Sequence, residues 1–320
     1  MNIKNFITLQ NSKKKLFTPG PGTLLEENIN GLSPCFGRGD DHYQKIEKFV
    51  LNRLKKMTGH RNLVRLQGSA SLALEISIQN FIYGKVLVVN TGVYSQRLIG
   101  MIKNSKVAKQ LKIINWKNIT EVEENFDWIV SCSTETSMGL KIPIADLFKI
   151  KKKCKSKLML DATASIGLED NHDLADLIAY SSCKGLFGLT GASFIAYNQT
   201  PYNKVNSFYM SIESHHNKLM TGPYHSIQSL YNVLKNHNKF KYSVEINKEK
   251  FLKVFKNLTV YNEKNQPLIC TYVKKKLVSK NKKIIFYKTR SKLEGSVLCH
   301  LGETYLKKKS KGDILKYIKI

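Results

Sequence analysis

The sequence predicts an α/β fold with a mostly parallel central sheet and a smaller α/β domain at its C-terminal end. Short apolar runs alternate with helical patterns from about residue 63 to about residue 197, the order expected of strand–helix–strand units. The chain has 320 residues, 42% of them hydrophobic, which suits one large domain plus a smaller one. From about residue 225 the alternation stops, and a Lys/Asn-rich stretch follows one helical segment.

The N-terminal elements come first in the chain. Residues 1–16 are polar and basic, so we expect a loose N-terminal arm. The TPGP segment, 18–21, predicts a rigid turn. A helix is predicted over 43–57, where apolar residues recur three and four positions apart between lysines.

The large domain is predicted to span 17–225 and the small domain 226–320. Strands of the large domain are expected at 63–66, 85–89, 111–114, 128–132, 158–160, 177–180 and 193–196, with helices at 72–82, 95–103 and 144–153. In the small domain we expect a helix at 225–234 and strands at 267–273, 284–287 and 297–301. Ligands of such sheets bind beyond the carboxyl ends of the strands, so the polar residues there are the candidates for chemistry.

The net charge of +28 comes from 46 lysines and 6 arginines against 24 acidic residues. Recognition of phosphate groups favours arginine, whereas lysine here is spread along the whole chain together with Asn and Ile. We therefore interpret the charge as a solvated basic surface and predict neither a nucleic-acid nor a membrane partner. An anionic small substrate would also be attracted by such a field.

The six cysteines form no C-x-x-C pair, and no His/Cys cluster has the spacing of a zinc site. We expect reduced thiols and no metal. The N-terminal residues lack the apolar core of a signal peptide, and no apolar run is long enough for a membrane helix. The expected location is cytoplasmic.

Three segments that follow predicted strands carry the candidate chemistry. Ser69, Ala70 and Ser71 form a small-residue turn before a helix, which suits a phosphate or is an ordinary strand-to-helix turn. Asp161 ends a buried strand, as a functional carboxylate or as a helix cap. Lys184 is followed by seven uncharged residues that include three glycines, so its amine is expected to be partly shielded from water and nucleophilic, unless it reaches solvent from its loop.

Together these segments match the needs of pyridoxal 5'-phosphate. That cofactor needs a lysine for covalent attachment, a carboxylate for its pyridine nitrogen and a cradle for its phosphate. The sequence resembles the class V aminotransferases among the fold-type I pyridoxal-phosphate enzymes, and within them 2-aminoethylphosphonate–pyruvate transaminases and alanine–glyoxylate aminotransferases. The stretches that carry the resemblance are 17–21, 66–75, 85–97, 133–139, 160–167, 181–197 and 221–223.

The resemblance implies a role for each matching residue. Lys184 and Asp161 would be catalytic, as the lysine that carries the cofactor and the partner of its pyridine nitrogen. Tyr94 would stack on the ring, Thr136 would lie near it, and Ser69, Ala70 and Ser71 would hold the phosphate. Thr221 would reach the phosphate from the other subunit, which implies a homodimer with shared active sites.

Two departures from the family pattern bear on the substrate and the cofactor. Cys183 stands where a polar side chain such as glutamine is frequent, and Val297 or a neighbour stands where an arginine usually binds the substrate carboxylate. Arg290 and Arg38 are the candidate substitutes for that arginine, and we favour Arg38. The C-terminal domain is also shorter than expected for the family.

The function predicted from these observations is transfer of an amino group from a small amine or amino acid, such as 2-aminoethylphosphonate, to a 2-keto acid such as pyruvate or glyoxylate. A pyridoxal-phosphate lyase of the same fold is the alternative. A desulfurase is disfavoured because no loop carries an obvious reactive cysteine. A degenerate non-catalytic homologue is the other alternative, against which Lys184 and Asp161 argue.

Overall fold

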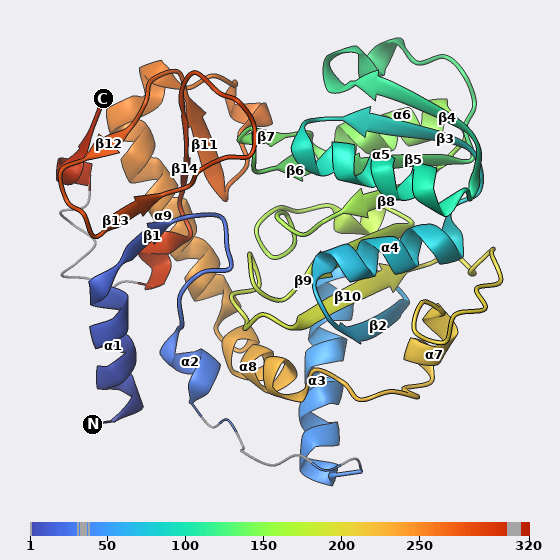
Figure 1. Cartoon of the computed structure of the whole chain (residues 1–320), viewed down its shortest axis with the longest axis horizontal. Coiled ribbons are helices and arrows are strands. Elements are labelled where there is room, and N and C mark those ends of the chain that lie inside the picture. Colours follow the sequence, from blue (N-terminus) through green and yellow to red (C-terminus); the bar gives the residue numbers. More distant parts are fainter. Residues whose placement is uncertain (1, 31, 33–36, 38, 306–314) are drawn as a thin grey trace.

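The computed structural model describes the chain except residues 1, 31, 33–36, 38 and 306–314. Its centre is a seven-stranded sheet with the strand order β2-β10-β9-β8-β5-β3-β4 (Figure 1). The strands are β2 (Asn62–Gln67), β3 (Gly84–Asn90), β4 (Ala108–Asn115), β5 (Trp128–Cys132), β8 (Lys157–Asp161), β9 (Leu177–Ser181) and β10 (Ala192–Tyr197). β10 is antiparallel to both of its neighbours and the other neighbouring pairs are parallel, which confirms the predicted mostly parallel sheet.

Helices cover both faces of this sheet. Successive residues of β3 point to opposite faces: Leu87 and Val89 pack with one set of helices, and Val86 and Val88 pack with the other. The first set is α3 (Asp41–Thr58), α6 (Ile144–Lys153) and α8 (Tyr224–Leu234), and the second is α4 (Ala70–Phe81), α5 (Val93–Ser105) and α7 (Ile212–His216). Because both faces are covered, β5, β9 and β10 are buried at every position, which is why they appear in the sequence as continuous apolar runs.

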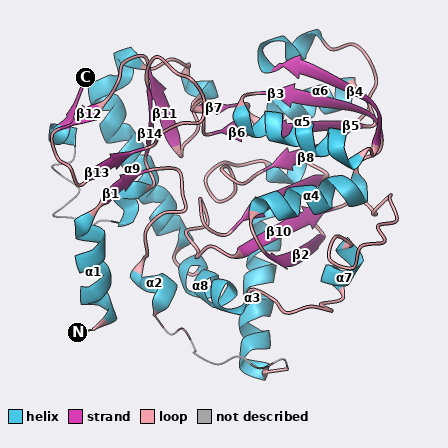
Figure 2. Ribbon diagram, in the orientation of Figure 1, coloured by secondary structure: helices cyan, strands magenta, loops and turns pink. Residues whose placement is uncertain are grey.

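The C-terminal part packs beside the sheet around the long helix α9 (His237–Phe255) (Figure 2). Its strands form two-stranded pairs: β11 (Cys270–Val273) with β14 (Ser296–Cys299), β12 (Val278–Ser279) with β15 (Ile318–Lys319), and β13 (Ile284–Phe286) with β1 (Lys15–Phe17). The remaining short elements are α2 (Glu26–Ile29), β6 (Thr134–Glu135) and β7 (Leu140–Lys141). The boundaries 17–225 and 226–320 stay predictions.

Residues 1–16 are a correction to the sequence analysis, which expected a loose arm. They contain the helix α1 (Ile3–Lys13), whose residues Ile7 and Asn11 are buried, and the start of β1. Asn11 donates from its side-chain amide to the backbone carbonyls of Leu24 and Tyr305. The arm is ordered because it packs on segments far away in the sequence, which its polar composition does not reveal.

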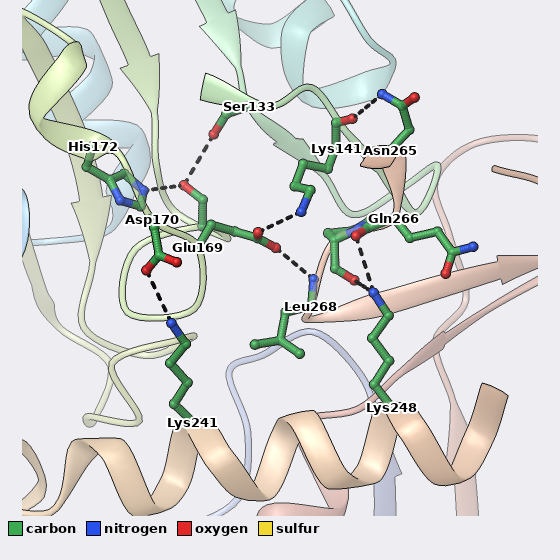
Figure 3. A network of polar contacts seen from close by, with 12 residues as sticks. Ser133, Lys141, Glu169, Asp170, His172, Lys241, Lys248, Asn265, Gln266 and Leu268 are labelled. Atoms are coloured by element: carbon green, nitrogen blue, oxygen red, sulfur yellow. Dashed lines mark hydrogen bonds and ion pairs between the residues drawn. The ribbon is translucent and has the colours of Figure 1, made fainter. Parts of the chain in front are cut away.

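A polar network joins the loop after β8 to the C-terminal part (Figure 3). Glu169 accepts from the Lys141 amine at 2.9 Å and from the backbone N–H of Leu268 at 2.7 Å. Lys248 of α9 donates to the carbonyl oxygens of Gln266 and Pro267, and its burial lowers the pKa of its amine. The loop that continues from Asp161 is thereby attached to the part of the chain that follows α9.

Among the helices of the described ranges, none has both the length and the apolar composition that a membrane crossing requires.

Candidate active site

The predicted site residues converge on one edge of the central sheet. Asp161 is the last residue of β8, and Lys184 follows the end of the neighbouring parallel strand β9. The turn at Ser69–Ser71 follows β2, whose carboxyl end lies at the same edge because β10 is antiparallel to both β2 and β9. Tyr94 follows β3 at this edge as well. The topology thus brings together segments that are up to 115 residues apart in the sequence.

Asp161 presents a buried carboxylate, with 7% of the residue exposed. Its Oδ1 accepts from the backbone N–H of Thr163 at 3.0 Å, and no lysine, arginine or histidine of the described part lies within ion-pair distance. A buried carboxylate without a cation is unfavourable. The protonated pyridine nitrogen of pyridoxal phosphate would supply the missing cationic partner of Asp161.

Lys184 places its amine Nζ 5.4 Å from the centroid of the Tyr94 ring. Within the described ranges it forms no ion pair with a carboxylate. Gly20 packs directly against it: a Cβ at Gly20 would lie 3.0 Å from Lys184 Cγ and 2.9 Å from the Cys183 carbonyl oxygen, and its φ is +112°. The TPGP turn therefore closes over the lysine, and only glycine fits there.

Tyr94 is positioned by Glu135, a residue to which the sequence analysis gave no role. The backbone N–H groups of Tyr94 and Ser95 donate to Glu135 Oε2 at 2.9 and 3.3 Å, which places a carboxylate at the first turn of α5. Burial raises the pKa of Glu135, and its hydrogen bonds to Ser137, Tyr94 and Ser95 oppose that shift. Glu135 lies in the stretch 133–139, which the sequence analysis singled out. Its contact with α5 becomes visible only in the folded structure.

The C-terminal part contributes Tyr287 to the site. Its hydroxyl lies 3.4 Å from the Tyr94 hydroxyl, and burial, followed by the contact with Tyr94, raises the pKa of Tyr287. The Ser291 hydroxyl donates to the Ser137 hydroxyl at 2.9 Å. Ser137 directly follows the buried Thr136. Nothing in the sequence pointed to Tyr287 or Ser291, because both contacts join distant segments.

The two candidate substrate arginines differ in what can be said of them. Arg38 lies outside the described residues. Arg290 is exposed and sits between Tyr287 and Ser291, which both touch the site. Val297 is buried in β14 opposite Tyr272, so it packs in the core.

The turn at the start of α4 offers unpaired backbone donors. Ser69 is the N-cap residue and makes no side-chain capping bond, so the first N–H groups of this 12-residue helix stay available. Ser71 accepts from Arg97 Nη1 at 3.2 Å. Thr221 is exposed in the segment between α7 and α8, and its predicted contact across a subunit boundary stays a prediction.

These features fit pyridoxal phosphate: an amine and a carboxylate without ionic partners among the described residues, an aromatic ring 5.4 Å from the amine, and a helix start whose N-cap side chain makes no capping bond. The chemistry of each group matches one part of the cofactor. Lys184, Asp161, Tyr94 and the turn at Ser69–Ser71 together suit the cofactor, and the role of each one stays a prediction.

Comparison with known proteins gives named relatives. No family model matches the chain. It is 26% identical over 218 residues to an uncharacterized aminotransferase of Helicobacter pylori, covering 62% of this chain and 58% of that protein. It is 25% identical over 256 residues to the 2-aminoethylphosphonate–pyruvate transaminase of Pseudomonas aeruginosa, covering 68% and 67%. The resemblance to class V aminotransferases is confirmed.

Similarity to a solved aminotransferase structure extends over nearly the whole chain. The alanine–glyoxylate aminotransferase from Nostoc sp. has a TM-score of 0.80 with 16% identity, covering 95% of this chain and 94% of that one. At this identity the match establishes the fold, which is that of the fold-type I pyridoxal-phosphate enzymes, as predicted. The chain spans 58% of the length of the first curated relatives it matches, so its activity is a matter for proposal.

Proposed function

We propose that this chain is a pyridoxal-phosphate-dependent aminotransferase. One observation carries the proposal: the amine of Lys184 and the buried carboxylate of Asp161 follow the ends of two neighbouring parallel strands. Neither group has an ionic partner in the described part of the chain. Named aminotransferases among the relatives support it.

The residues of the site divide the work. The cofactor, when bound, withdraws electrons from the carbon that carries the amino group and makes its proton acidic. Lys184 would hold the cofactor through its amine, and when that amine is free its Nζ would accept that proton and donate it again. Asp161 would keep the ring nitrogen of the cofactor protonated through a charged hydrogen bond.

The surrounding side chains orient and enclose the ring. Tyr94 would stack on the cofactor ring, and the hydrogen bonds from its backbone N–H and that of Ser95 to Glu135 hold the start of α5 in place. Thr136 would lie near the ring, and the turn Ser69–Ser71 would hold the phosphate through backbone donors. Tyr287 closes the side that faces the C-terminal part and helps to exclude water.

The proposed substrates are a small amine or amino acid and a 2-keto acid such as pyruvate or glyoxylate. The Pseudomonas aeruginosa relative is named for 2-aminoethylphosphonate and pyruvate, and the basic surface of this chain favours such anions. Arg38 and Arg290 are the proposed partners of the substrate carboxylate. A homodimer in which Thr221 completes the neighbouring site is part of the proposal.

A lyase on the same fold is the second candidate, because Val297 is buried and Arg290 points to solvent. A panel of donors and acceptors separates the two. The protein is loaded with cofactor and mixed in turn with 2-aminoethylphosphonate, alanine and serine, and the absorbance of the cofactor is followed. An aminotransferase converts the cofactor to its aminated form, and pyruvate or glyoxylate restores it. Turnover of a donor without an aminated form, and without any need for a keto acid, would establish the lyase instead.

A further inference from the structure

Arg97 lies beside the turn that is proposed to hold the cofactor phosphate. Its Nη1 donates to Ser71 Oγ at 3.2 Å, and its Cζ lies 5.2 Å from the centroid of the Tyr94 ring. Arg97 follows Tyr94 by three residues in α5, so the two side chains share one face of the helix. The guanidinium therefore lies between the stacking ring and the first turn of α4.

The charge of Arg97 is not neutralised by the described part of the chain. No described carboxylate lies within 4.0 Å of its guanidinium, whereas the buried Arg65 is paired with Glu47. Arg97 is only partly exposed. A partly buried cation without a counter-ion is unfavourable and attracts an anion to it.

A phosphate ester at this turn needs more positive charge than the helix provides. A phosphate monoester carries about −1.5 to −2 charges, and a helix N-terminus supplies about half a positive charge. Cys183 offers only a thiol, a weak donor that lies 3.7 Å from Ser181 Oγ. The amine of Lys184 is used for the covalent attachment.

We propose that Arg97 binds the phosphate group of the cofactor. One guanidinium nitrogen stays on Ser71 while the remaining N–H groups donate to phosphate oxygens, as the forked geometry of arginine allows. This inference rests on the proposed function. It assigns to Arg97 the charge compensation that neither Cys183 nor the helix start provides.

The test compares two ligands that differ only in the phosphate. Apoprotein is titrated with pyridoxal phosphate and with pyridoxal, and binding is followed by protein fluorescence. In Arg97→Met the affinity for pyridoxal phosphate is expected to fall by about 10- to 100-fold, as for loss of a charged hydrogen bond, while the affinity for pyridoxal stays within about two-fold. Arg61→Met is the matched control, because Arg61 is exposed and hydrogen-bonds to Asn198, away from the turn at Ser69–Ser71. It is expected to bind both ligands as the wild type does.

The outcomes separate this inference from the proposed function. Equal losses for both ligands would show that Arg97 acts only through the Tyr94 ring, and an unchanged affinity for pyridoxal phosphate would show no role, so either result overturns the inference. If the wild type binds neither ligand, the proposed function itself fails. Arg97→Lys keeps the positive charge. Its affinity for pyridoxal phosphate is therefore expected to fall less than that of Arg97→Met.

Discussion

The two halves of the candidate site are built in different ways. The cofactor half comes from loops that directly follow strands of one sheet, so each side chain is fixed by the end of a buried strand, as Asp161 is by β8. The half proposed to face the substrate, called here the substrate half, includes the segment 287–291 of the C-terminal part, where Tyr287 and Ser291 stand outside regular strands and touch the site through hydroxyl groups. Arg38, its other proposed member, lies outside the described residues. The residues proposed to hold the cofactor are therefore placed by the ends of strands in one sheet, whereas those proposed to face the substrate depend on packing between segments that are distant in the sequence.

The largest expected effect is at the cofactor half. Lys184→Ala removes both the attachment point and the proton carrier, so the conversion of a donor is expected to slow by at least about 10⁴-fold. The measurement is single-turnover absorbance of the cofactor with an active donor. Lys103→Ala, an exposed position of α5, is the control and should react at the wild-type rate. A Lys184→Ala protein that still converts the donor rapidly would contradict the assignment.

Asp161→Asn should follow in size. The amide has the shape of the carboxylate but cannot keep the ring nitrogen protonated through a charged bond, so proton removal is expected to slow by about 10²-fold or more while the cofactor still binds. Single-turnover rates and cofactor affinity are measured on the same preparation. Asp173→Asn, at an exposed position, controls for the loss of charge. A near wild-type rate in Asp161→Asn would reduce that residue to a cap for the Thr163 backbone N–H.

The substrate half is tested by the two arginines. Replacing the residue that binds the substrate carboxylate by alanine is expected to raise KM for pyruvate or glyoxylate by at least about 10-fold, because a charged partner is left unpaired. The affinity for the cofactor should not change. Arg38→Ala and Arg290→Ala are compared, with Arg53→Ala as an exposed control. If neither changes KM, a cation other than these two binds the acceptor, or the lyase becomes the better proposal.

The smallest expected effect concerns stability in acid, to which one buried histidine near the sheet and one in the C-terminal part contribute. Burial lowers the pKa of His172, near the sheet, to about 4 and that of His300, in the C-terminal part, to about 3. Below the ordinary value of 6.5 the unfolded chain binds protons that the folded chain does not. Stability is therefore full above pH 6.5 and falls as the pH drops from 6.5 towards 4 for His172, and further towards 3 for His300.

Two histidine variants measure this contribution. His172→Gln and His300→Gln should each flatten the loss of unfolding free energy between pH 6.5 and 4.5, followed by denaturant titration. His225→Gln, at an exposed position, is the surface variant measured beside them. An unchanged slope in both buried variants would mean that these side chains titrate normally in the folded protein.

The sequence predicted the strands of the central sheet better than the helices α1 and α9. The runs 85–89, 128–132 and 158–160 coincide with buried strands, and their strong apolar signal placed Asp161 correctly at the end of β8. The helices α1 and α9 were missed, because their few buried apolar residues, such as Phe240 and Phe251, are separated by lysines and asparagines. Their order comes from long-range packing, which no local pattern encodes.

The same distinction holds among the side chains. Lys184 stood out because of the uncharged, glycine-rich residues around it. The structure gives one reason for a glycine there: Gly185 packs so closely on Ile166 that a Cβ would clash with the Ile166 carbonyl oxygen. Glu135 and Tyr287 could not be assigned, because their partners are about 40 and 190 residues away in the chain. Contacts of that kind depend on the register of the sheet and on the placement of the C-terminal part.

The covalent site is the most direct test of this account. The cofactor-loaded protein is reduced with borohydride, digested and mapped by mass spectrometry. The modified peptide is expected to contain Lys184 alone among the 46 lysines, because its amine lies beside the Tyr94 ring and is close to Gly20. Modification of a different lysine, or modification spread over many surface lysines with Lys184 unreacted, would contradict the assignment of this edge of the sheet as the active site.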